Sequence, residues 1–210
     1  MLHQLFFLAL TYAISAVPFG LVVAKIFAKT DIRELGSKNI GATNVARVVG
    51  KKLGLLTLIL DGSKGAVMVI AARYNFSEID NLHLFLTLVS LIAVIGHVFP
   101  VYLHFKGGKG VATTIAVLLA LDFRVGFLVI IFWIMSFFIF RISSISSLAA
   151  IASSIALSYY YKAPIEQIIL CWILFMIVLI RHKENISRLL IGEESSFSKA
   201  KNNATNDTKN

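Results

Sequence analysis

Three short polar segments interrupt an otherwise apolar chain, and each combines cationic side chains with glycines, amides or hydroxyls. They are residues 36–44 (GSKNIGATN), 105–110 (FKGGKG) and 182–188 (HKENISR). Glycine lets backbone N–H groups approach an oxyanion closely, and lysine or arginine neutralises its charge. Each segment lies where an apolar run ends, so three of them on one face of a membrane would form a site for phosphorylated molecules.

The first segment belongs to a connection between apolar runs that is long for a membrane protein, so we expect it to fold back into the protein. Arg47, which follows it, offers a bidentate fork for phosphate or carboxylate. The alternative is a loop that caps a short helix and contacts anionic lipid. The candidate neutral donors are Ser37, Asn39, Thr43 and Asn44.

The second segment leads directly into the apolar run 111–121. Gly107 and Gly108 before a helix start would present free N–H groups and the positive end of a helix dipole, with Lys109 beside them. The segment is not a nucleotide-binding P-loop, because Leu103 stands where the first glycine should be and the position after the lysine is not Ser or Thr. The alternative is a flexible turn with a lysine that reaches the membrane surface.

The third segment places His182, Asn185 and Arg188 at intervals of three residues. On a helix that leaves the membrane they would form one polar stripe. Histidine could bind phosphate or relay a proton, and asparagine could orient a hydroxyl group. The alternative is a helix that anchors the chain at the membrane surface.

Several polar residues fall within or beside the apolar runs. Asp61 and Lys64 are three residues apart and share a helical face, where they could form an ion pair with either a structural or a functional role. His97 is typical of a hydrogen bond between helices. Ser144 and Ser147 also share a face, close to where one apolar run gives way to the next.

Composition indicates a membrane protein that binds anions. Hydrophobic residues make up 58% of the 210 residues, mean hydropathy is +0.82, and Lys and Arg outnumber Asp and Glu by 20 to 11. No basic face with interleaved aromatics lies outside the apolar runs, which argues against nucleic acid as a partner. We expect no metal, because carboxylates and histidines are scattered. Cys171 lies inside an apolar run, where we expect it only to pack.

The apolar runs predict an all-α integral membrane protein with about seven transmembrane helices, because a span needs roughly 20 apolar residues. The first run is too long for a cleaved signal, and 111–121 is short for a span. Residues 1–192 would form a single membrane domain, and 193–210 a disordered polar tail. The expected spans are 5–28, 53–73, 82–104, 111–121, 125–140, 147–161 and 165–181.

The distribution of Lys and Arg predicts the orientation. With the amino terminus outside, only Arg73, Arg124 and Lys162 lie outside, Lys64 lies within a span, and the remaining basic residues lie in the cytoplasm. The carboxyl terminus and all three polar segments would then be cytoplasmic. If 111–121 did not span, every later segment would be inverted and the basic tail would lie outside, which the charge distribution opposes.

The three segments in this order resemble the bacterial acyl-phosphate:glycerol-3-phosphate acyltransferases, the PlsY family. The resemblance runs over nearly the whole chain, and 36–47, 96–113 and 182–193 carry it. The family often has Gly at the position of Lys38. The resemblance implies an enzyme of the bacterial inner membrane that needs no cofactor. It would transfer an acyl group from acyl phosphate to glycerol 3-phosphate, releasing phosphate and lysophosphatidate, in the first acylation step of phospholipid biosynthesis.

The resemblance, with the chemistry of the side chains, assigns roles to the polar residues. Ser37, Lys109, His182 and Asn185 would be catalytic. Phosphate would be held by Arg47, Lys109, Gly107, Gly108, Asn39, Thr43 and Asn44. Supporting residues would be Ser144, Ser147, Arg188, Asp61, Lys64 and His97. The hydroxyl proton would go to His182 or to a phosphate oxygen of the substrate. Membrane lipid would surround the protein, and the sequence indicates no oligomeric state.

The reaction suits these residues because acyl phosphate is a mixed anhydride and already activated. Holding two anionic groups together can supply roughly 7–11 kcal/mol of barrier reduction without a strong base. None of the five histidines has Asp five residues later, which argues against the His-x4-Asp acyltransferase mechanism. Two other classes compete: a transporter or channel for an organic phosphate, and a non-catalytic membrane protein with a lipid-binding surface. The concentration of candidate ligands on one side opposes the first, and the interleaved Gly, Asn and Ser oppose the second.

Overall fold

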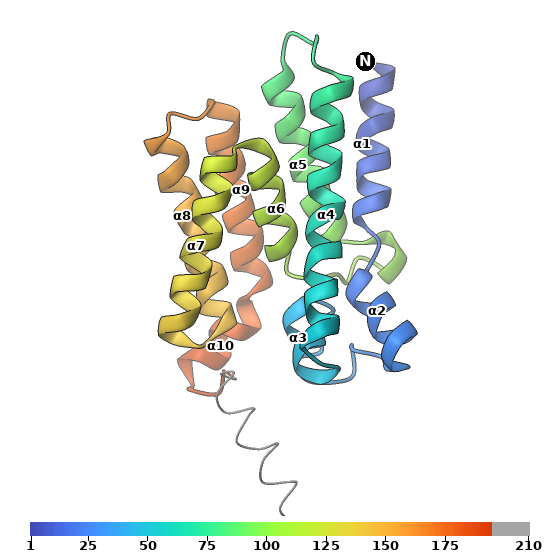
Figure 1. The fold of residues 1–210 in the computed structure, drawn as a ribbon, viewed down its shortest axis with the longest axis vertical. Coiled ribbons are helices and arrows are strands. Elements are labelled where there is room, and N and C mark those ends of the chain that lie inside the picture. The colour runs from blue at the N-terminus through green and yellow to red at the C-terminus, as the bar shows by residue number, and fades with distance from the viewer. Residues whose placement is uncertain (195–210) are drawn as a thin grey trace, which may run out of the picture.

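The regular structure of the described part of the chain, residues 1–194 of a computed structural model, is helical throughout. The short helices α2, α3 and α10 lie at the end of the molecule opposite the amino terminus (Figure 1). The helices are α1 Leu2–Ser15, α2 Phe19–Ala28, α3 Ala42–Val48, α4 Lys51–Asn75, α5 Leu82–Val98, the 3-10 turn η1 Val101–Leu103, α6 Val111–Leu121, α7 Phe123–Phe140, α8 Ser143–Tyr160, α9 Ile165–Arg181 and α10 Lys183–Leu190.

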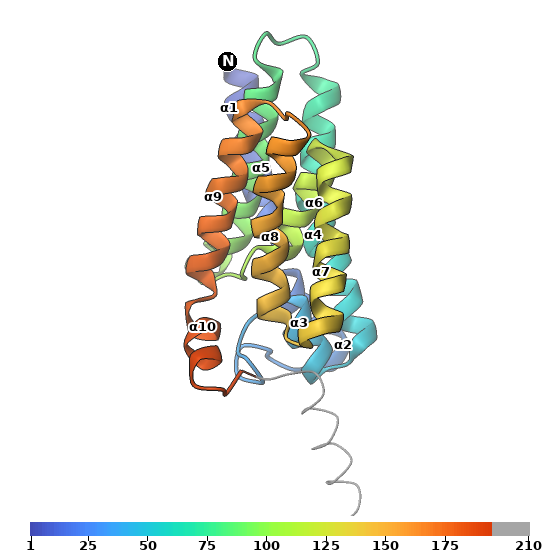
Figure 2. The same ribbon diagram turned by 90° about the vertical axis from the view of Figure 1, so that its left-hand side faces the viewer.

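The long helices form two groups. Helices α1, α4 and α5 pack together on one side, and α7, α8 and α9 on the other (Figures 1 and 2). Helix α6 packs on both α4 and α7, and α9 also packs on α5, so the two groups are joined through the middle of the molecule.

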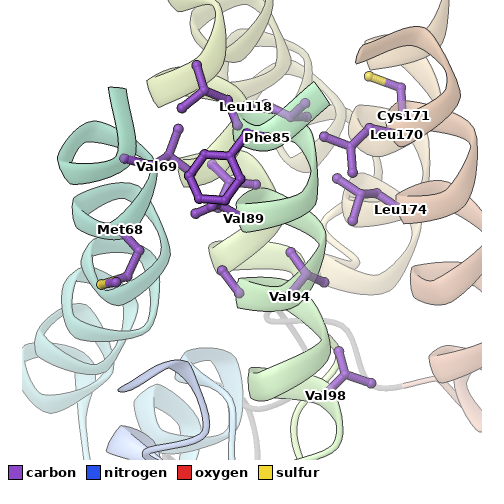
Figure 3. Close-up of a cluster of buried hydrophobic side chains, with 14 of the residues drawn as sticks. Met68, Val69, Phe85, Val89, Val94, Val98, Leu118, Leu170, Cys171 and Leu174 are labelled. Atoms are coloured by element: carbon purple, nitrogen blue, oxygen red, sulfur yellow. The ribbon is translucent and has the colours of Figure 1, made fainter. Parts of the chain in front are cut away.

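A buried apolar cluster fixes this junction. It draws side chains from five helices, α4, α5, α6, α8 and α9. Val69 on α4, Val89 on α5, Leu118 on α6 and Leu174 on α9 are fully buried in it (Figure 3). Interiors packed in this way resist displacement of single elements. The cluster therefore fixes the end of α5, the start of α6 and the end of α9, which carry two of the three polar segments.

Helix α6 is short because the chain turns inside the bundle instead of at its end (Figure 1). Its 11 residues span about 16 Å, roughly half of a bilayer core of about 30 Å. The loop before it, residues 99–110, therefore lies at depth in the molecule. Irregular backbone at such depth is tolerated where protein or an aqueous cavity surrounds it.

Four helical stretches are long and apolar enough to cross a membrane: Leu2–Ala28, Lys51–Asn75, Leu82–Leu103 and Phe123–Phe140. A fifth results if α9 and α10, which bend by 60° at His182, count as one span. The expectation of an all-helical membrane protein is confirmed in this form. Seven crossings and an outside amino terminus stay predictions.

The long connection between α2 and α3 folds back into the protein, as the sequence predicts. Ile32 and Ile40 are buried in a cluster with Leu21 of α2 and Val45 of α3. This packing holds residues 36–44 against α2 and α3, at the end of the molecule opposite the amino terminus (Figure 1). The predicted disordered tail falls mostly on 195–210, which lie outside the described residues; Glu193 and Glu194 are described.

Candidate active site

A cavity of about 1130 Å³ opens between the two helix groups at the end that carries α3 and α10. The three polar segments line the part nearest α3 and α10, here called its entrance, and mostly apolar side chains of α4, α6 and α7 line the rest, together with Asp61, Ser63 and His97. The polar set includes Ser37, Asn39, Thr43, Arg47, Lys109, Ser144, His182, Asn185 and Arg188. The apolar set includes Leu58, Ile59, Ala66, Ile115, Leu119, Ile130 and Trp133. The predicted convergence of the three segments is therefore confirmed.

Asn44 lines the cavity and also forms the framework of the loop around Ser37, so its expected role in binding phosphate stays a prediction. Its side chain is 1% exposed. Its Oδ1 accepts a hydrogen bond from the Ser37 N–H at 2.9 Å, and its Nδ2 donates to the carbonyls of Ile32, Leu35 and Asn39 at 3.2, 3.0 and 2.9 Å. These bonds occupy the amide and shape the loop around Ser37.

The other members of the first segment lie at the cavity. Asn39 uses its Oδ1 to accept from the Gly41 N–H at 2.8 Å, and the Thr43 hydroxyl is 3.3 Å from that of Ser143. Ser37 and Arg47 line the cavity as well. The segment thus brings a hydroxyl and a guanidinium to the entrance.

Residues 107–110, here called the glycine loop, do not present the free N–H groups of Gly107 and Gly108 that the sequence suggested. The Gly107 N–H donates to the Val98 carbonyl at 3.1 Å, and the Gly108 N–H donates to the His97 carbonyl at 3.2 Å. A Cβ on Gly108 would lie 2.1 Å from His97 Nε2. Glycine is needed here because the loop packs tightly against the end of α5, and Lys109 is the residue that the loop delivers to the cavity.

Arg181 holds the same loop from the other side, a role that the sequence analysis missed. Its guanidinium donates to the Gly107 carbonyl at 2.8 Å and to the Gly108 carbonyl at 3.2 Å. The sequence feature that could have indicated this role is the position of Arg181, a cation directly before His182 at the end of the last apolar run. Arg181 thereby ties the glycine loop to the start of α10.

Lys109 links the second and third segments. Its Nζ donates to Oδ1 of Asn185. The pKa of Lys109 is lowered to about 8, chiefly by burial; Glu194 and Glu184 oppose this shift, and Arg188 and Arg181 add to it. The side chain is therefore a cation at neutral pH and loses its charge in mildly alkaline solution.

His182 lies at the bend between α9 and α10 and is 2% exposed. Its Nδ1 is 2.8 Å from the Val178 carbonyl oxygen. Because a carbonyl can only accept, this contact assigns the proton to Nδ1 and leaves Nε2 of the neutral ring as an acceptor.

Glu194 also belongs to the site, although the sequence analysis placed it in the tail. Its Oε1 accepts from Asn185 Nδ2 at 2.5 Å and from the Ser144 hydroxyl at 2.9 Å, and its Oε2 accepts from Arg188 Nε at 2.8 Å. Burial raises the pKa of Glu194, but these hydrogen bonds lower it by more, so the group is ionised. The sequence feature that could have indicated this role is the acidic pair Glu193 and Glu194 shortly after the third polar segment.

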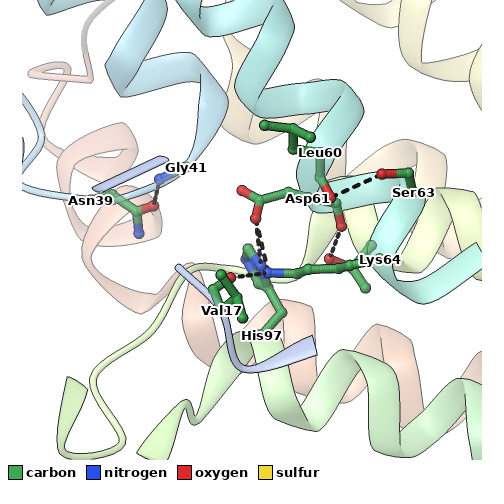
Figure 4. A network of polar contacts seen from close by, with 9 residues as sticks. Val17, Asn39, Gly41, Leu60, Asp61, Ser63, Lys64 and His97 are labelled. Carbon is green, nitrogen blue, oxygen red and sulfur yellow. Dashed lines mark hydrogen bonds and ion pairs between the residues drawn. The ribbon is translucent and has the colours of Figure 1, made fainter. Parts of the chain in front are cut away.

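The predicted ion pair between Asp61 and Lys64 is confirmed. Lys64 Nζ is 2.9 Å from Asp61 Oδ1 and donates to the Val17 carbonyl at 2.9 Å, where Pro18 separates α1 from α2 (Figure 4). His97 Nδ1 is 3.5 Å from the same Asp61 oxygen. The cluster therefore connects α4, α5 and the α1–α2 break, and Asp61 and His97 also line the cavity.

The two predicted serines of α8 also reach the cavity. Ser147 Oγ donates to the Ser143 carbonyl at 2.7 Å and accepts from Trp133 Nε1 at 3.1 Å. Ser144 contacts Glu194 as described above. Ser147 therefore orients Trp133 at the boundary between the polar entrance and the apolar wall.

Two other expectations concern cysteine and metal. Cys171 is buried, with its sulfur 3.3 Å from the Ser158 hydroxyl, which agrees with a packing role. Among residues 1–194, no group of three or more His, Cys, Asp or Glu side chains could hold a metal ion.

Fold and site together define an all-helical membrane protein whose cavity joins a cationic entrance to an apolar wall. That combination suits an enzyme that handles a molecule with a phosphate group and a hydrocarbon chain. The comparisons with known proteins agree with this class.

The family model for glycerol-3-phosphate acyltransferase matches residues 5–192. The glycerol-3-phosphate acyltransferase of Wolbachia pipientis subsp. Culex pipiens is 42% identical over 190 residues, which are 90% of this chain and 96% of that protein. That of Ehrlichia canis is 44% identical over 190 residues, with the same two shares.

The crystal structure of PlsY (YgiH), an integral membrane glycerol 3-phosphate acyltransferase, is also similar. Its glycerol 3-phosphate form matches with a TM-score of 0.87 and 36% identity, over 93% of this chain and 96% of that one. Its lysophosphatidic acid form matches with a TM-score of 0.85. The chain therefore belongs to the glycerol-3-phosphate acyltransferase family and is an acyltransferase.

Proposed function

We propose that this enzyme transfers a fatty acyl group from acyl phosphate to a hydroxyl of glycerol 3-phosphate, forming lysophosphatidate and inorganic phosphate. One observation carries the proposal: a single cavity combines Arg47, Lys109 and Arg188 at its entrance with an apolar wall between α4 and α7. Both substrates are anionic at one end, and only the acyl donor needs the apolar wall. The PlsY structures with glycerol 3-phosphate and lysophosphatidic acid support the acceptor and the product.

The cations would hold the two phosphate groups beside each other. Arg47 offers a planar fork to one phosphate from α3, and Lys109 offers a point charge from the glycine loop. Ser37 and Asn185 would orient the acceptor. Preorganised charge of this kind acts with most effect in a site from which water is excluded.

The acyl chain would lie along α6. The apolar residues that line the cavity extend from Val111 to Leu119 on that helix, a length of about 12 Å at 1.5 Å per residue. Helices α4 and α7 run in opposite directions (Figure 1), so the lining residues farthest from α3 are the last on α4, Ala66, and the first on α7, Ile130. The reacting carbonyl would then lie between this groove and the cationic entrance.

The chemical step exchanges one acyl–oxygen bond for another. The acceptor hydroxyl oxygen attacks the carbonyl carbon, and the resulting oxyanion collapses with cleavage of the bond to the phosphate oxygen. His182 Nε2 would accept a hydrogen bond from the attacking hydroxyl. The hydroxyl proton passes to an oxygen of the leaving phosphate, so the products are the ester and hydrogen phosphate, and no other reactant is required.

We also propose that the enzyme lies in the bacterial inner membrane with this entrance in the cytoplasm. The basic residues around α2, α3 and α10, such as Lys25, Lys51 and Lys183, support that orientation.

A donor comparison tests the proposal. Purified protein is given glycerol 3-phosphate with either acyl phosphate or acyl-CoA, and lysophosphatidate is measured. We expect product only with acyl phosphate, and a loss of about 100-fold or more in Arg47→Ala at unchanged folding. Product only with acyl-CoA would contradict the proposal. So would flux of glycerol 3-phosphate into sealed vesicles without any product.

A further inference from the structure

Glu194 places a carboxylate among groups that the proposed function assigns to anionic substrates. Its side chain is 8% exposed in its ion pair with Arg188. Asn185, Ser144 and Arg188 all donate to it, from α8 and α10. A buried carboxylate that accepts three hydrogen bonds is fixed in orientation and stays ionised.

We propose that Glu194 is a positioning residue, which orients the Asn185 side chain so that its amide oxygen faces Lys109. This inference rests on the proposed function. It concerns a residue outside the three polar segments, and one that need not touch the reacting atoms.

The orientation follows from the hydrogen bonds of the Asn185 amide. Its Nδ2 can only donate, and Glu194 Oε1 accepts from it. The amide oxygen must then point the opposite way, where Lys109 Nζ donates to it. Without the carboxylate, the amide could rotate and present Nδ2 to Lys109, which would repel the ammonium ion.

The charge of Glu194 acts on Lys109 as well. Burial lowers the pKa of Lys109, and Glu194 is the largest of the groups that oppose this shift. The other charged or titratable groups that face Lys109 are Glu184, Arg181, Arg188 and His182. Because three of these four carry or can gain positive charge, the loss of Glu194 would leave Lys109 in a more cationic surrounding.

A different role would have opposite consequences. The carboxylate could imitate a substrate anion and compete with it for Arg188. Its removal would then lower KM for glycerol 3-phosphate and raise activity. Positioning predicts a fall in kcat instead, because the groups that hold the reactants lose their alignment.

The test compares Glu194→Gln with Glu193→Gln, which makes the same change at the exposed neighbouring residue. Both full-length proteins are assayed for kcat, KM and thermal unfolding, and kcat is expressed per folded molecule. We expect Glu194→Gln to lower kcat about 10–100-fold and Glu193→Gln to stay within about twofold of the wild type. In an Asn185→Ala background, Glu194→Gln should cost far less than in the wild type, because the two residues act through one contact.

A second measurement does not depend on turnover. The rate of Lys109 acetylation by acetic anhydride is followed against pH by mass spectrometry, which reports the ionisation of this amine. We expect Glu194→Gln to lower the midpoint by about half a pH unit or more, and Glu193→Gln to leave it unchanged.

The outcomes separate the two ideas. An unchanged acetylation midpoint, or a higher kcat with a lower KM, would overturn the positioning role. A loss of activity that only follows the loss of folded protein would do the same. If the wild type formed no product, the proposed function would fail, while the acetylation midpoint would still decide whether Glu194 acts on Lys109.

Discussion

Lys109 is the residue at which the glycine loop and α10 meet, and its ionisation should be visible in the rate. Because burial lowers its pKa to about 8, the ammonium form is complete below that pH and disappears above it. A group that must be charged to hold phosphate gives activity that falls as pH rises through its pKa.

We therefore expect kcat/KM to be level near pH 7 and to decline with a midpoint near 8. Lys109→Arg, which stays charged, should remove this decline even if its overall rate is lower. Lys109→Ala should cost about 10²–10³-fold, and Lys106→Ala, at the exposed lysine of the same loop, should cost little. A level profile from pH 7 to 9.5 in the wild type would contradict the assignment.

We expect Asn44 to contribute to the stability of the fold through its hydrogen bonds. Asn44→Ala would leave the buried carbonyl of Ile32, the carbonyl of Leu35 and the Ser37 N–H without their partner. We expect a loss of about 1–3 kcal/mol in the free energy of unfolding, measured in detergent. Thr43→Ala, one residue away, is the control and should change stability little. Full stability in Asn44→Ala would show that water replaces these bonds.

At the scale of elements, the loop between α5 and α6 is held by two sets of hydrogen bonds, one to the end of α5 and one to Arg181 at the end of α9. Its N–H groups bond to the end of α5, and its carbonyls accept from Arg181 of α9. The loop can therefore hold Lys109 at a set depth only while α5, α6 and α9 keep their packing.

Gly108→Ala tests this arrangement. Its methyl group would lie 2.1 Å from the His97 ring, so the loop must move and carry Lys109 with it. A displacement of about 1 Å at a catalytic group can cost about 100-fold. We expect such a loss in kcat while the enzyme remains folded, as judged by gel filtration and thermal unfolding. Activity close to the wild type would mean that the loop adapts without moving Lys109.

Helices α4, α6 and α7 should determine the length of the acyl chain. Ala66 lines the far end of the cavity on α4, whereas the next residue, Val67, is 57% exposed. We expect Ala66→Phe to shift the preferred acyl phosphate to shorter chains, and Val67→Phe to leave the profile unchanged. The measurement is kcat/KM for a series of saturated acyl phosphates. A uniform loss across the series would contradict a role in chain length.

For the whole molecule, the orientation in the membrane is the main prediction. Lys38 lies in the α2–α3 connection and Lys162 in the turn between α8 and α9, at opposite ends of the helices (Figures 1 and 2). Cysteine at position 38 should react with an impermeant reagent only after cells are opened, and cysteine at 162 should react in intact cells. The buried native Cys171 serves as an internal control. Labelling of both positions from outside would overturn the proposed topology.

The sequence was sufficient to predict the helices and the polar segments, because long apolar runs and the residues that interrupt them are local features of the chain. It also placed Asp61 and Lys64 where they could pair, since residues three apart share one face of a helix. The family resemblance rested on local motifs in the same way.

Only the tertiary structure decided how the polar groups are used. Asn44 and the Gly107 and Gly108 amides have the chemistry of phosphate ligands, yet neighbouring carbonyls, side chains and N–H groups already occupy them. Arg181 and Glu194 lie directly beside the third segment in the sequence, but their partners, the glycine loop and Asn185, are set by the packing of α9 and α10. A hydrogen-bonding group satisfies its nearest partner in space, and that partner is fixed by helix packing, which local sequence does not specify.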